Sequence, residues 1–435
     1  MVSEQSVTRQ WAGQDRPDWL PCSVATSTGH VLTLAGHDVA ITHPEKVVFP
    51  ELGVTKLDLV EHYLAVAEGA LRGVAGRPMV LKRFVKGIAE EAVFQKRAPT
   101  KRPEWLEVAE LRYASGTSAA ETVVRDTAGL AYVVNLNCID LNPHPVLAED
   151  LDHPVELRID LDPVPGVPWG QIVDVAFVVR EVLLDHGLTA WPKTSGSRGI
   201  HVYAPVHHEP GVQVWTYPQL RRAAETVARE VENRAPDLAT SRWWKEEREG
   251  VFVDFNQNAK DRTVASAWSV RATPDARVSM PLTWDEVRDV DPAEHTIRTA
   301  AGRFAEIGDP WAGMDDVAGS LQPLLDLAKA LGPAEKPPKG TGRRTMTMPL
   351  VEIARTRTKP EALDLVQVWR DAHPAVAAHL HEADVLVDGM RGSSSLWYRV
   401  RINLQHVPEE QRPEQGDLLA DYNPWTNYRG PQRPS

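Results

Sequence analysis

The stretch RIDLDP, residues 158–163, decides the expected fold because it places two carboxylates two residues apart within an apolar run. Side chains alternate between the two faces of a β-strand. If this stretch is a strand, Leu157, Ile159 and Leu161 can pack into a core. Asp160 and Asp162 then leave together from the opposite face, and such a pair suits a divalent metal ion.

A second apolar run supplies a third acid. VFVDF, residues 251–255, predicts a buried strand that carries Asp254. Two metal ions held roughly 3.5–4 Å apart by three carboxylates would stabilise both the attacking and the leaving oxygen of an in-line phosphoryl displacement. Asp-x-Asp also occurs on many solvent-facing strands, so the residues around it must decide between a metal site and a plain polar face.

The composition is that of a globular protein. A chain of 435 residues with 42% hydrophobic content can form one large core or two to three smaller ones. Cys22 and Cys138 lack CxxC or Cys/His spacing, which argues against a disulfide framework and a structural zinc site. No stretch approaches the roughly 18 apolar residues of a membrane span, and no signal-peptide h-region is visible. We expect a cytoplasmic protein that makes no membrane contact and joins the nucleoid when bound to DNA.

The formal charge of −12 argues against a nonspecific coat on nucleic acid, but it allows a local basic track. Residues 80–105 contain such a track, in which cations alternate with aromatic residues: Lys82, Arg83, Phe84, Lys86, Phe94, Lys96, Arg97, Lys101, Arg102 and Trp105. Cations beside aromatic rings can hold phosphates and stack bases. A solvated charged face around core aromatics is about equally compatible with this composition.

TSGSRGIHVY, residues 194–203, lies between the acidic strands. Its small residues, with Ser195 among them, predict a turn whose backbone N–H groups face phosphate oxygens. Arg198 adds a bidentate cation, and His201 follows on the next strand. The turn lacks the GxxxxGK[ST] pattern, so alone it is an ordinary turn. Beside the acid pair we interpret it as a triphosphate cradle, with Arg271 on a later strand-like run as a cation for the leaving pyrophosphate.

HPEKVVFPELGVTK, residues 43–56, contains a second candidate phosphate site. Thr55 as N-cap would put Lys56 in the first helical turn, where the helix dipole disfavours a cation unless an anion is bound there. Together with Lys46, this residue indicates a site for a terminal phosphate. A solvated lysine at a helix start is the alternative.

The order of predicted elements indicates an α+β fold in which the acidic strands are central. The predicted divisions are an irregular N-terminal arm over residues 1–28, a catalytic core over 29–305, a helix and basic Pro/Gly linker over 306–345, and a C-terminal extension and tail over 346–435. We expect this extension to be small and mainly helical, with a break at Pro374 and one strand in LWYRVRINLQ.

Taken together, these residues resemble the polymerase domain of bacterial ligase D, a branch of the archaeo-eukaryotic primase superfamily. The likeness covers roughly residues 30–290, with the motifs in the family's order: KVVFP…TK, RPMVLKRF, DLD, TSGSRGIH, VFVDF and SVRA, closed by PLTWDEV. The resemblance implies a primase-polymerase-like core with a central antiparallel or mixed sheet that bears the acids and is flanked by helices. It also implies template-directed addition of nucleotides to a primer 3′-hydroxyl, with two Mn²⁺ or Mg²⁺ ions.

The resemblance assigns a role to each matching residue. The catalytic metal ligands would be Asp160, Asp162 and Asp254. The contacts to the incoming nucleotide (NTP or dNTP) would be Ser195, Arg198, His201, Arg271, Lys82 and Asn142. The downstream 5′-phosphate of the DNA would be held by Lys46, Lys56 and His43. The residues along the DNA path would be Phe84, Phe94 and Arg248, the last in the family's mobile loop that helps to place the primer end.

Three departures from the family pattern bear on these roles. Arg198 stands where the family usually has lysine, which keeps the charge and changes its geometry. His43 replaces an asparagine that is often found after the first hairpin. NLNCIDLNPHP stands where a histidine commonly approaches the nucleotide, so Asn142 or His144 would take that part. Sugar selectivity is therefore left open.

The expected activity is filling of short 5′-phosphorylated gaps or break ends in DNA repair, with ribonucleotides favoured as they generally are in the family. No KxDG ligase motif appears, so we expect a stand-alone relative without ligase or nuclease domains. A separate DNA ligase and an end-binding protein would be its partners. The alternatives are a primer-synthesising primase-polymerase, a non-catalytic module that binds gaps or ends, and a two-metal nuclease.

Overall fold

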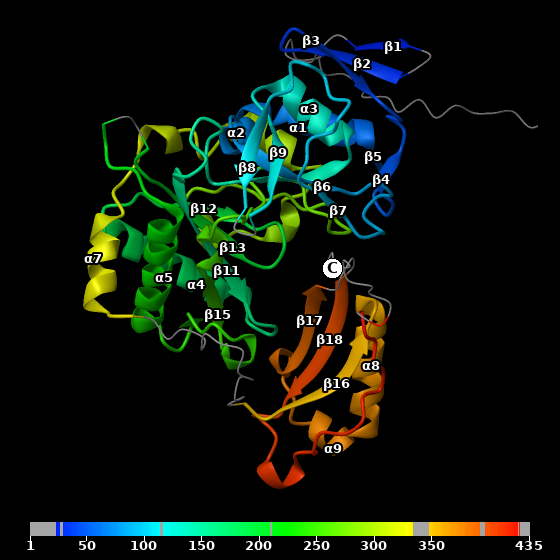
Figure 1. Ribbon diagram of the computed structural model, residues 1–435, viewed down its shortest axis with the longest axis vertical. Helices are drawn as coiled ribbons and strands as arrows, with labels where there is room; N and C mark the ends of the chain where they lie inside the picture. The colour runs from blue at the N-terminus through cyan, green and yellow to red at the C-terminus, as the bar shows by residue number, and fades with distance from the viewer. Residues whose placement is uncertain are drawn as a thin grey trace, which may run out of the picture. The chain divides into compact units, whose positions relative to one another are not determined.

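Figure 1 shows the computed structural model of the chain. It describes residues 23–26, 29–113, 116–208, 211–333, 348–391, 396–424 and 426. The chain divides into two compact units. The first comprises Met1–Asp152, Lys260–Pro281 and Asp291–Ala312, and the second comprises His153–Ala259, Leu282–Val290 and Gly313–Ser435.

The first unit is built on an antiparallel sheet of strand order β10-β6-β9-β8, with β7 also paired to β6. Its strands are β6 (Pro78–Arg83), β7 (Val93–Gln95), β8 (Val108–Arg112), β9 (Ser118–Val123) and β10 (Cys138–Pro143). Its helices are α1 (Lys56–Ala65), α2 (Ala67–Val74), α3 (Thr127–Asn135) and α6 (Ala300–Ile307). Both α2 and α3 pack on β10, and α1 packs on α3, so the core lies between helices and sheet.

Two smaller sheets complete this unit. They are β1 (Ser23–Thr26), β2 (Gly29–Leu34) and β3 (His37–Ile41) in that order, and the pair β4 (Val47–Phe49) and β5 (Val54–Thr55). The irregular arm predicted over residues 1–28 falls largely on residues 1–22, which lie outside the described part. Its end at β1 is a strand, because it pairs along its length with β2.

The second unit carries the acidic strands in a sheet of order β12-β13-β11-β15-β14. Its strands are β11 (Glu156–Pro163), β12 (Trp191–Thr194), β13 (Ile200–Pro205), β14 (Ala239–Thr240) and β15 (Val251–Asp254). All pairs are antiparallel except β14 with β15, which gives the mixed central sheet that was predicted. The helices α4 (Trp169–Asp185) and α5 (Tyr217–Arg234) pack on this sheet, and α7 (Gln322–Ala330) packs on α5 (Figure 1).

The predicted alternation along β11 is confirmed. Leu157, Ile159 and Leu161 are fully buried, whereas Asp160 is half-buried and Asp162 is exposed on the opposite face of the strand. Burying each aliphatic side chain stabilises the fold by about 1.5–3 kcal/mol. This burial fixes the register of β11, because a shift by one residue would bring the acids into the core.

The C-terminal extension differs from its prediction. Its strands β16 (Leu350–Thr356), β17 (Val385–Arg391) and β18 (Leu396–Asn403) form an antiparallel sheet of order β16-β18-β17, and α8 (Lys359–Ala372) packs on it, followed by α9 (Pro374–Ala377). The strand in LWYRVRINLQ and the break at Pro374 are confirmed. The expectation of a mainly helical extension was wrong, because the residues of β17 pair with β18 along their whole length instead of continuing a helix.

Short 3₁₀ helices connect these elements. They are η1 (Lys245–Glu247), η2 (Asn256–Asn258), η3 (Glu286–Arg288), η4 (Pro292–Glu294), η5 (Met314–Asp316), η6 (Glu382–Asp384) and η7 (Glu409–Gln411). Residues 334–347, which include the end of the segment predicted as a helix and linker over 306–345, lie outside the described part. Within that part, none of the helices combines the length and the apolar character needed to cross a bilayer.

Candidate active site

Four polar side chains form a row across the central sheet of the second unit. The register pairs Asp160 of β11 with His201 of β13 on one side and with Asp254 of β15 on the other. His201 is in turn paired with Lys193 of β12. Residues directly opposite each other on neighbouring strands project from the same face of a sheet. Lys193, His201, Asp160 and Asp254 therefore stand in line on one face.

His201 links the members of this row. Its Nε2 lies 3.2 Å from Asp160 Oδ1, and its Nδ1 lies 2.9 Å from Lys193 Nζ. A charged lysine has only donors, so Nδ1 accepts from Lys193 and Nε2 carries the proton that is donated to Asp160. Lys193 is fully buried and was missed in the sequence. The predicted hairpin could have indicated Lys193. Lys193 lies on the strand before the TSGSRG turn, opposite His201 on the strand after it.

The three carboxylates repel one another in a partly desolvated site. Burial first, and then the charge of Asp160, raise the pKa of both Asp162 and Asp254. Such crowding favours binding of a cation. An all-oxygen donor set matches the preference of Mg²⁺ and Mn²⁺, so the residues fit the metal that the family implies.

Each of these carboxylates also has a partner of its own. Asp254 accepts hydrogen bonds from Asn256 N at 2.8 Å and Gln257 Nε2 at 3.0 Å, and Asp162 lies 3.9 Å from Arg198 Nη2. Across the described ranges, the triad is not a group whose oxygens all lie within 4.8 Å of one another. To hold a shared ion, these side chains would have to come closer to one another than they lie here.

A group of His381, Asp384 and His406 in the extension does meet that distance. Its polar atoms are used in a cap at η6. The His381 side chain accepts from the Asp384 backbone N–H, and Asp384 accepts from His381 N and from His406 Nδ1 at 2.8 and 2.9 Å. These hydrogen bonds account for the cluster as a structural feature, so we do not assign a metal to it.

The TSGSRG turn is closed by its own hydrogen bonds. Ser195 Oγ accepts from Ser197 N at 3.1 Å and from Gly199 N at 3.0 Å, and Ser195 N donates to Gly199 O at 2.9 Å. These backbone donors therefore point to Ser195 rather than to a ligand. Arg198 remains exposed at the tip of the turn, as a cation beside Asp162.

Asp140 organises the predicted nucleotide contacts of the first unit. Its buried Oδ2 lies 2.9 Å from Lys82 Nζ and 3.9 Å from Arg271 Nε. Its backbone oxygen accepts from Asn142 Nδ2 at 3.1 Å. Sequence reasoning missed this acid, because its partners Lys82 and Arg271 are distant in the sequence and come beside it only through the fold. Asp140 thus orients two cations through its carboxylate and one amide through its backbone oxygen.

The other aromatic and histidine candidates of this unit separate by burial. His144 is buried, with its Nε2 at 2.9 Å from Glu121 Oε2, so the half-buried Asn142 is the more accessible of the two residues considered for the nucleotide. Phe84, which was predicted to lie along the DNA path, is also buried in the core. Phe94 is 65% exposed and can offer its ring to a base.

Lys46 and Lys56 lie together beside the start of α1. The predicted N-cap is confirmed, since Thr55 forms a capping box with Asp58. Lys56 is buried, donates through Nζ to Thr42 O at 2.6 Å, and donates through its backbone N to Lys46 O at 2.8 Å. Desolvation, followed by the charge of Lys46, lowers the pKa of Lys56 to about 8.

The remaining members of the predicted sites lie nearby in the same units. The exposed His43 has a positive φ of 50° and contacts Glu45 at 4.0 Å. Arg248 lies in the second unit, where its guanidinium stands 3.3 Å from the centre of the Phe252 ring. Asp254 and Asp162 attract its charge, although desolvation lowers the pKa of Arg248.

The family described as "LigD, primase-polymerase domain" matches residues 55–311. The chain belongs to this family. The matched range includes the three acids, the TSGSRG turn and Asp140, and it ends before the C-terminal sheet. The predicted resemblance and the predicted fold class of the core are thereby confirmed.

Relatives of known name support the assignment. The multifunctional non-homologous end joining protein LigD of Mycolicibacterium smegmatis is 33% identical over 317 residues, which cover 70% of this chain and 40% of that protein. The bifunctional LigD of Bacillus subtilis is 27% identical over 296 residues, covering 68% and 47%. The polymerase domain of Mycobacterium tuberculosis ligase D, solved in complex with DNA, matches with a TM-score of 0.59 at 31% identity, covering 64% of this chain and 99% of that one. The chain spans about one third to one half of the length of the curated relatives that it matches.

Gly199 allows this LigD-family turn to pass β11 closely. A Cβ at this position would lie 2.1 Å from Leu161 O, between the two acids, whereas a Cβ at Gly170 in α4 would meet nothing within 4 Å. Gly199→Ala should therefore lower the free energy of unfolding by about 1–3 kcal/mol. Gly170→Ala should leave it unchanged or raise it by up to about 1 kcal/mol. Urea titration followed by circular dichroism measures both, and equal midpoints would contradict the close packing of this turn.

Proposed function

We propose that this protein is a template-directed nucleotidyltransferase that fills short 5′-phosphorylated gaps or break ends during DNA repair. The observation that carries the proposal is the row of Asp160, His201 and Asp254 on one sheet face, with Asp162 two residues along β11. Membership in the LigD primase-polymerase family supports it, as does the likeness to a polymerase domain that binds DNA. NTPs or dNTPs and gapped DNA are the substrates that this proposal requires.

Asp160, Asp162 and Asp254 would hold two divalent ions. Bound there, the ions would lower the pKa of the primer 3′-hydroxyl and neutralise triphosphate charge. The chain's own residues prepare this site. His201 donates to Asp160 and restricts its orientation, while Lys193 sets the tautomer of His201. Arg198 offers an exposed bidentate donor for phosphate oxygens.

The residues gathered around Asp140 would bind the nucleotide. Lys82 and Arg271 together carry more positive charge than Asp140 neutralises, so the cluster favours an anionic partner. Asn142 has an amide that both donates and accepts, and it would meet the 2′-hydroxyl of a ribonucleotide. We therefore propose that ribonucleotides are preferred over deoxyribonucleotides.

A catalytically idle module that binds 5′-phosphorylated ends is the second candidate. Lys46 and Lys56 alone would suffice for it, because two adjacent ammonium groups attract a phosphate without any metal. The crowded carboxylates favour the catalytic proposal, since a binding module has no use for mutually repelling acids on one face. A separate ligase and an end-binding protein remain proposed partners.

The test of this function is extension of a labelled primer on a short gap bearing a 5′-phosphate, with Mn²⁺ and either ribo- or deoxyribonucleotides. Addition confined to the gap and stronger with ribonucleotides is expected. Shortening of the primer would indicate a nuclease, and products made without any primer would indicate a primase. No change in primer length with either sugar would favour the binding module.

Asp160→Ala should abolish extension, because it removes the acid at the centre of the row. Binding to gapped DNA should stay within about threefold of wild type, since the cations that meet phosphates are untouched. Asp185→Ala is the matched control, as it removes an acid of α4 whose ion pair with Arg234 lies at the surface. Residual incorporation by Asp160→Ala within tenfold of wild type would defeat the assignment.

The low pKa of Lys56 predicts a pH-dependent preference for 5′-phosphate over 5′-hydroxyl ends. The cationic form of Lys56 binds phosphate. With a pKa of about 8, the cationic fraction of Lys56 falls from about 90% at pH 7 to about 10% at pH 9. The preference should therefore weaken by up to about tenfold as pH rises over this range. Lys56→Arg stays charged and should keep a flat profile. Parallel profiles for the two proteins, measured by competition binding, would refute this role.

A further inference from the structure

A charged network joins the C-terminal sheet to the loop that precedes the third acid. This loop, residues 241–250, connects β14 to β15 and contains η1. Arg401 of β18 donates through Nε and Nη2 to Asp388 Oδ2 of β17 at 3.0 and 2.7 Å. Its Nη1 lies 3.5 Å from Glu246 Oε1 in the loop. Asn403 Nδ2 adds a hydrogen bond to Glu246 O at 3.1 Å.

The network is buried, unlike an ion pair between exposed side chains. Glu246 is 5% exposed, Arg401 is 9% exposed and Asn403 is 1% exposed. An exposed ion pair contributes little to stability, whereas removing one partner of a buried pair leaves an uncompensated charge and costs far more. Lys245 Nζ also lies 3.8 Å from Asp388 Oδ1 at the edge of this network. Detaching the loop would therefore be costly.

The same short loop carries Arg248, two residues beyond Glu246. Arg248 donates to the loop carbonyls of Arg242 at 3.1 Å and Trp243 at 3.0 Å, so its position follows that of the loop. Its guanidinium stacks on Phe252 of β15, two residues before Asp254. A displacement at Glu246 would thus be transmitted to the cation beside the acids.

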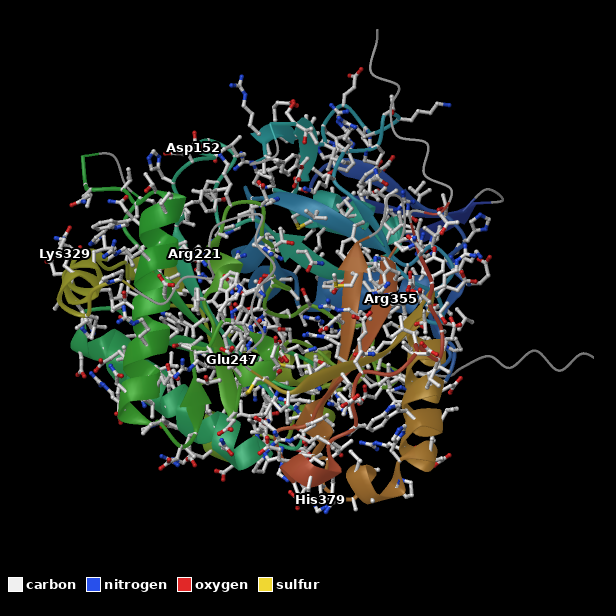
Figure 2. All side chains as sticks on the ribbon, turned by 60° about the horizontal axis from the view of Figure 1, so that its bottom comes forward. Asp152, Arg221, Glu247, Lys329, Arg355 and His379 are labelled. Carbon is white, nitrogen blue, oxygen red and sulfur yellow. The ribbon has the colours of Figure 1, made fainter. Side chains whose placement is uncertain are left out.

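The first half of the loop is supported from another side. Figure 2 labels Arg221 on α5 and Glu247 at the end of η1. The Arg221 guanidinium lies 5.7 Å from the Trp243 ring and 5.2 Å from the Phe255 ring. Cation–π contacts at partly exposed positions are weaker than a buried ion pair with hydrogen bonds. The helix side thus holds the loop less firmly than the buried charges of the C-terminal sheet.

We propose that the C-terminal sheet is a positioning element for the active site. Asp388 orients Arg401, Arg401 holds Glu246, and the anchored loop holds Arg248 beside the metal-binding acids. The sheet lies beyond residue 311, where the family match ends, and it contacts a loop that lies inside the matched range. The anchoring stands by itself, and only its effect on primer extension rests on the proposed function.

Limited trypsin digestion of the full-length protein tests the anchoring without any assay of activity. The loop offers cleavage sites after Arg242, Lys245 and Arg248. Glu246→Gln removes the loop side of the pair and leaves Arg401 with Asp388, so the sheet should stay folded. Cleavage within the loop, identified by mass spectrometry, should become about tenfold faster, because protease attack follows the population of the opened form.

Arg399→Gln is the matched control. Arg399 is on β18, the same strand as Arg401, and its Nη2 lies 3.7 Å from Asp388 of β17. Within the described part, none of the contacts of Arg399 reaches the loop. Its cleavage rate should equal that of wild type. Arg401→Gln should match Glu246→Gln, and the double variant should be no worse than either single one, because the two residues act through one contact. Equal loop cleavage in all variants would overturn the anchoring.

Primer-extension kinetics on gapped DNA test the positioning role. Glu246→Gln and Arg401→Gln should raise the KM for DNA about fivefold or more, with a smaller change in kcat, while Arg399→Gln should change neither. A released loop with unchanged KM and kcat would overturn the positioning role. Absence of extension by wild type would instead count against the proposed function, and the digestion would still decide whether the sheet holds the loop.

Discussion

The mutual repulsion of three carboxylates on one sheet face is the constraint on which the rest of the second unit depends. Desolvation and the charge of Asp160 raise the pKa of both Asp162 and Asp254, so the site is stable only with positive charge or donors around it. The fold supplies them from different elements. His201 meets Asp160, Arg198 meets Asp162, and Arg248 faces Asp254 from the loop before β15. The same need for positive charge makes the site suited to divalent ions.

Local patterns predicted the parts of this site that depend on a single strand. The alternation in RIDLDP fixed which residues enter the core, and the Thr55 cap fixed the start of α1. Contacts between strands were not predictable in the same way. Lys193 becomes a partner of His201 only through the register of β12 and β13, and Asp140 gains its meaning from side chains that lie 58 and more residues away.

The C-terminal extension was misjudged for a related physical reason. Residues 374–387 have apolar positions that are compatible with helical spacing, and intrinsic propensity is only a weak prior against tertiary pairing. β17, which includes Val385, Val387 and Met390, is a strand because every one of its residues pairs with a residue of β18. These partners are too far apart in sequence for a local pattern to indicate them. The buried Val400 and Ile402 of β18 then supply the hydrophobic reason for that pairing.

The two units use charge in opposite senses, and this division suits the proposed chemistry. In the second unit, several acids share a few cations, which favours metal ions. In the first unit, one buried acid, Asp140, orients Lys82 and Arg271, which favours phosphate. The spacing of the acids in the second unit is fixed by the register of their sheet, so adjustment of the active site need not come from the acids themselves. That adjustment can come from the loop that carries Arg248. This gives a reason for the buried ion pair between Glu246 of the loop and Arg401 of the C-terminal sheet.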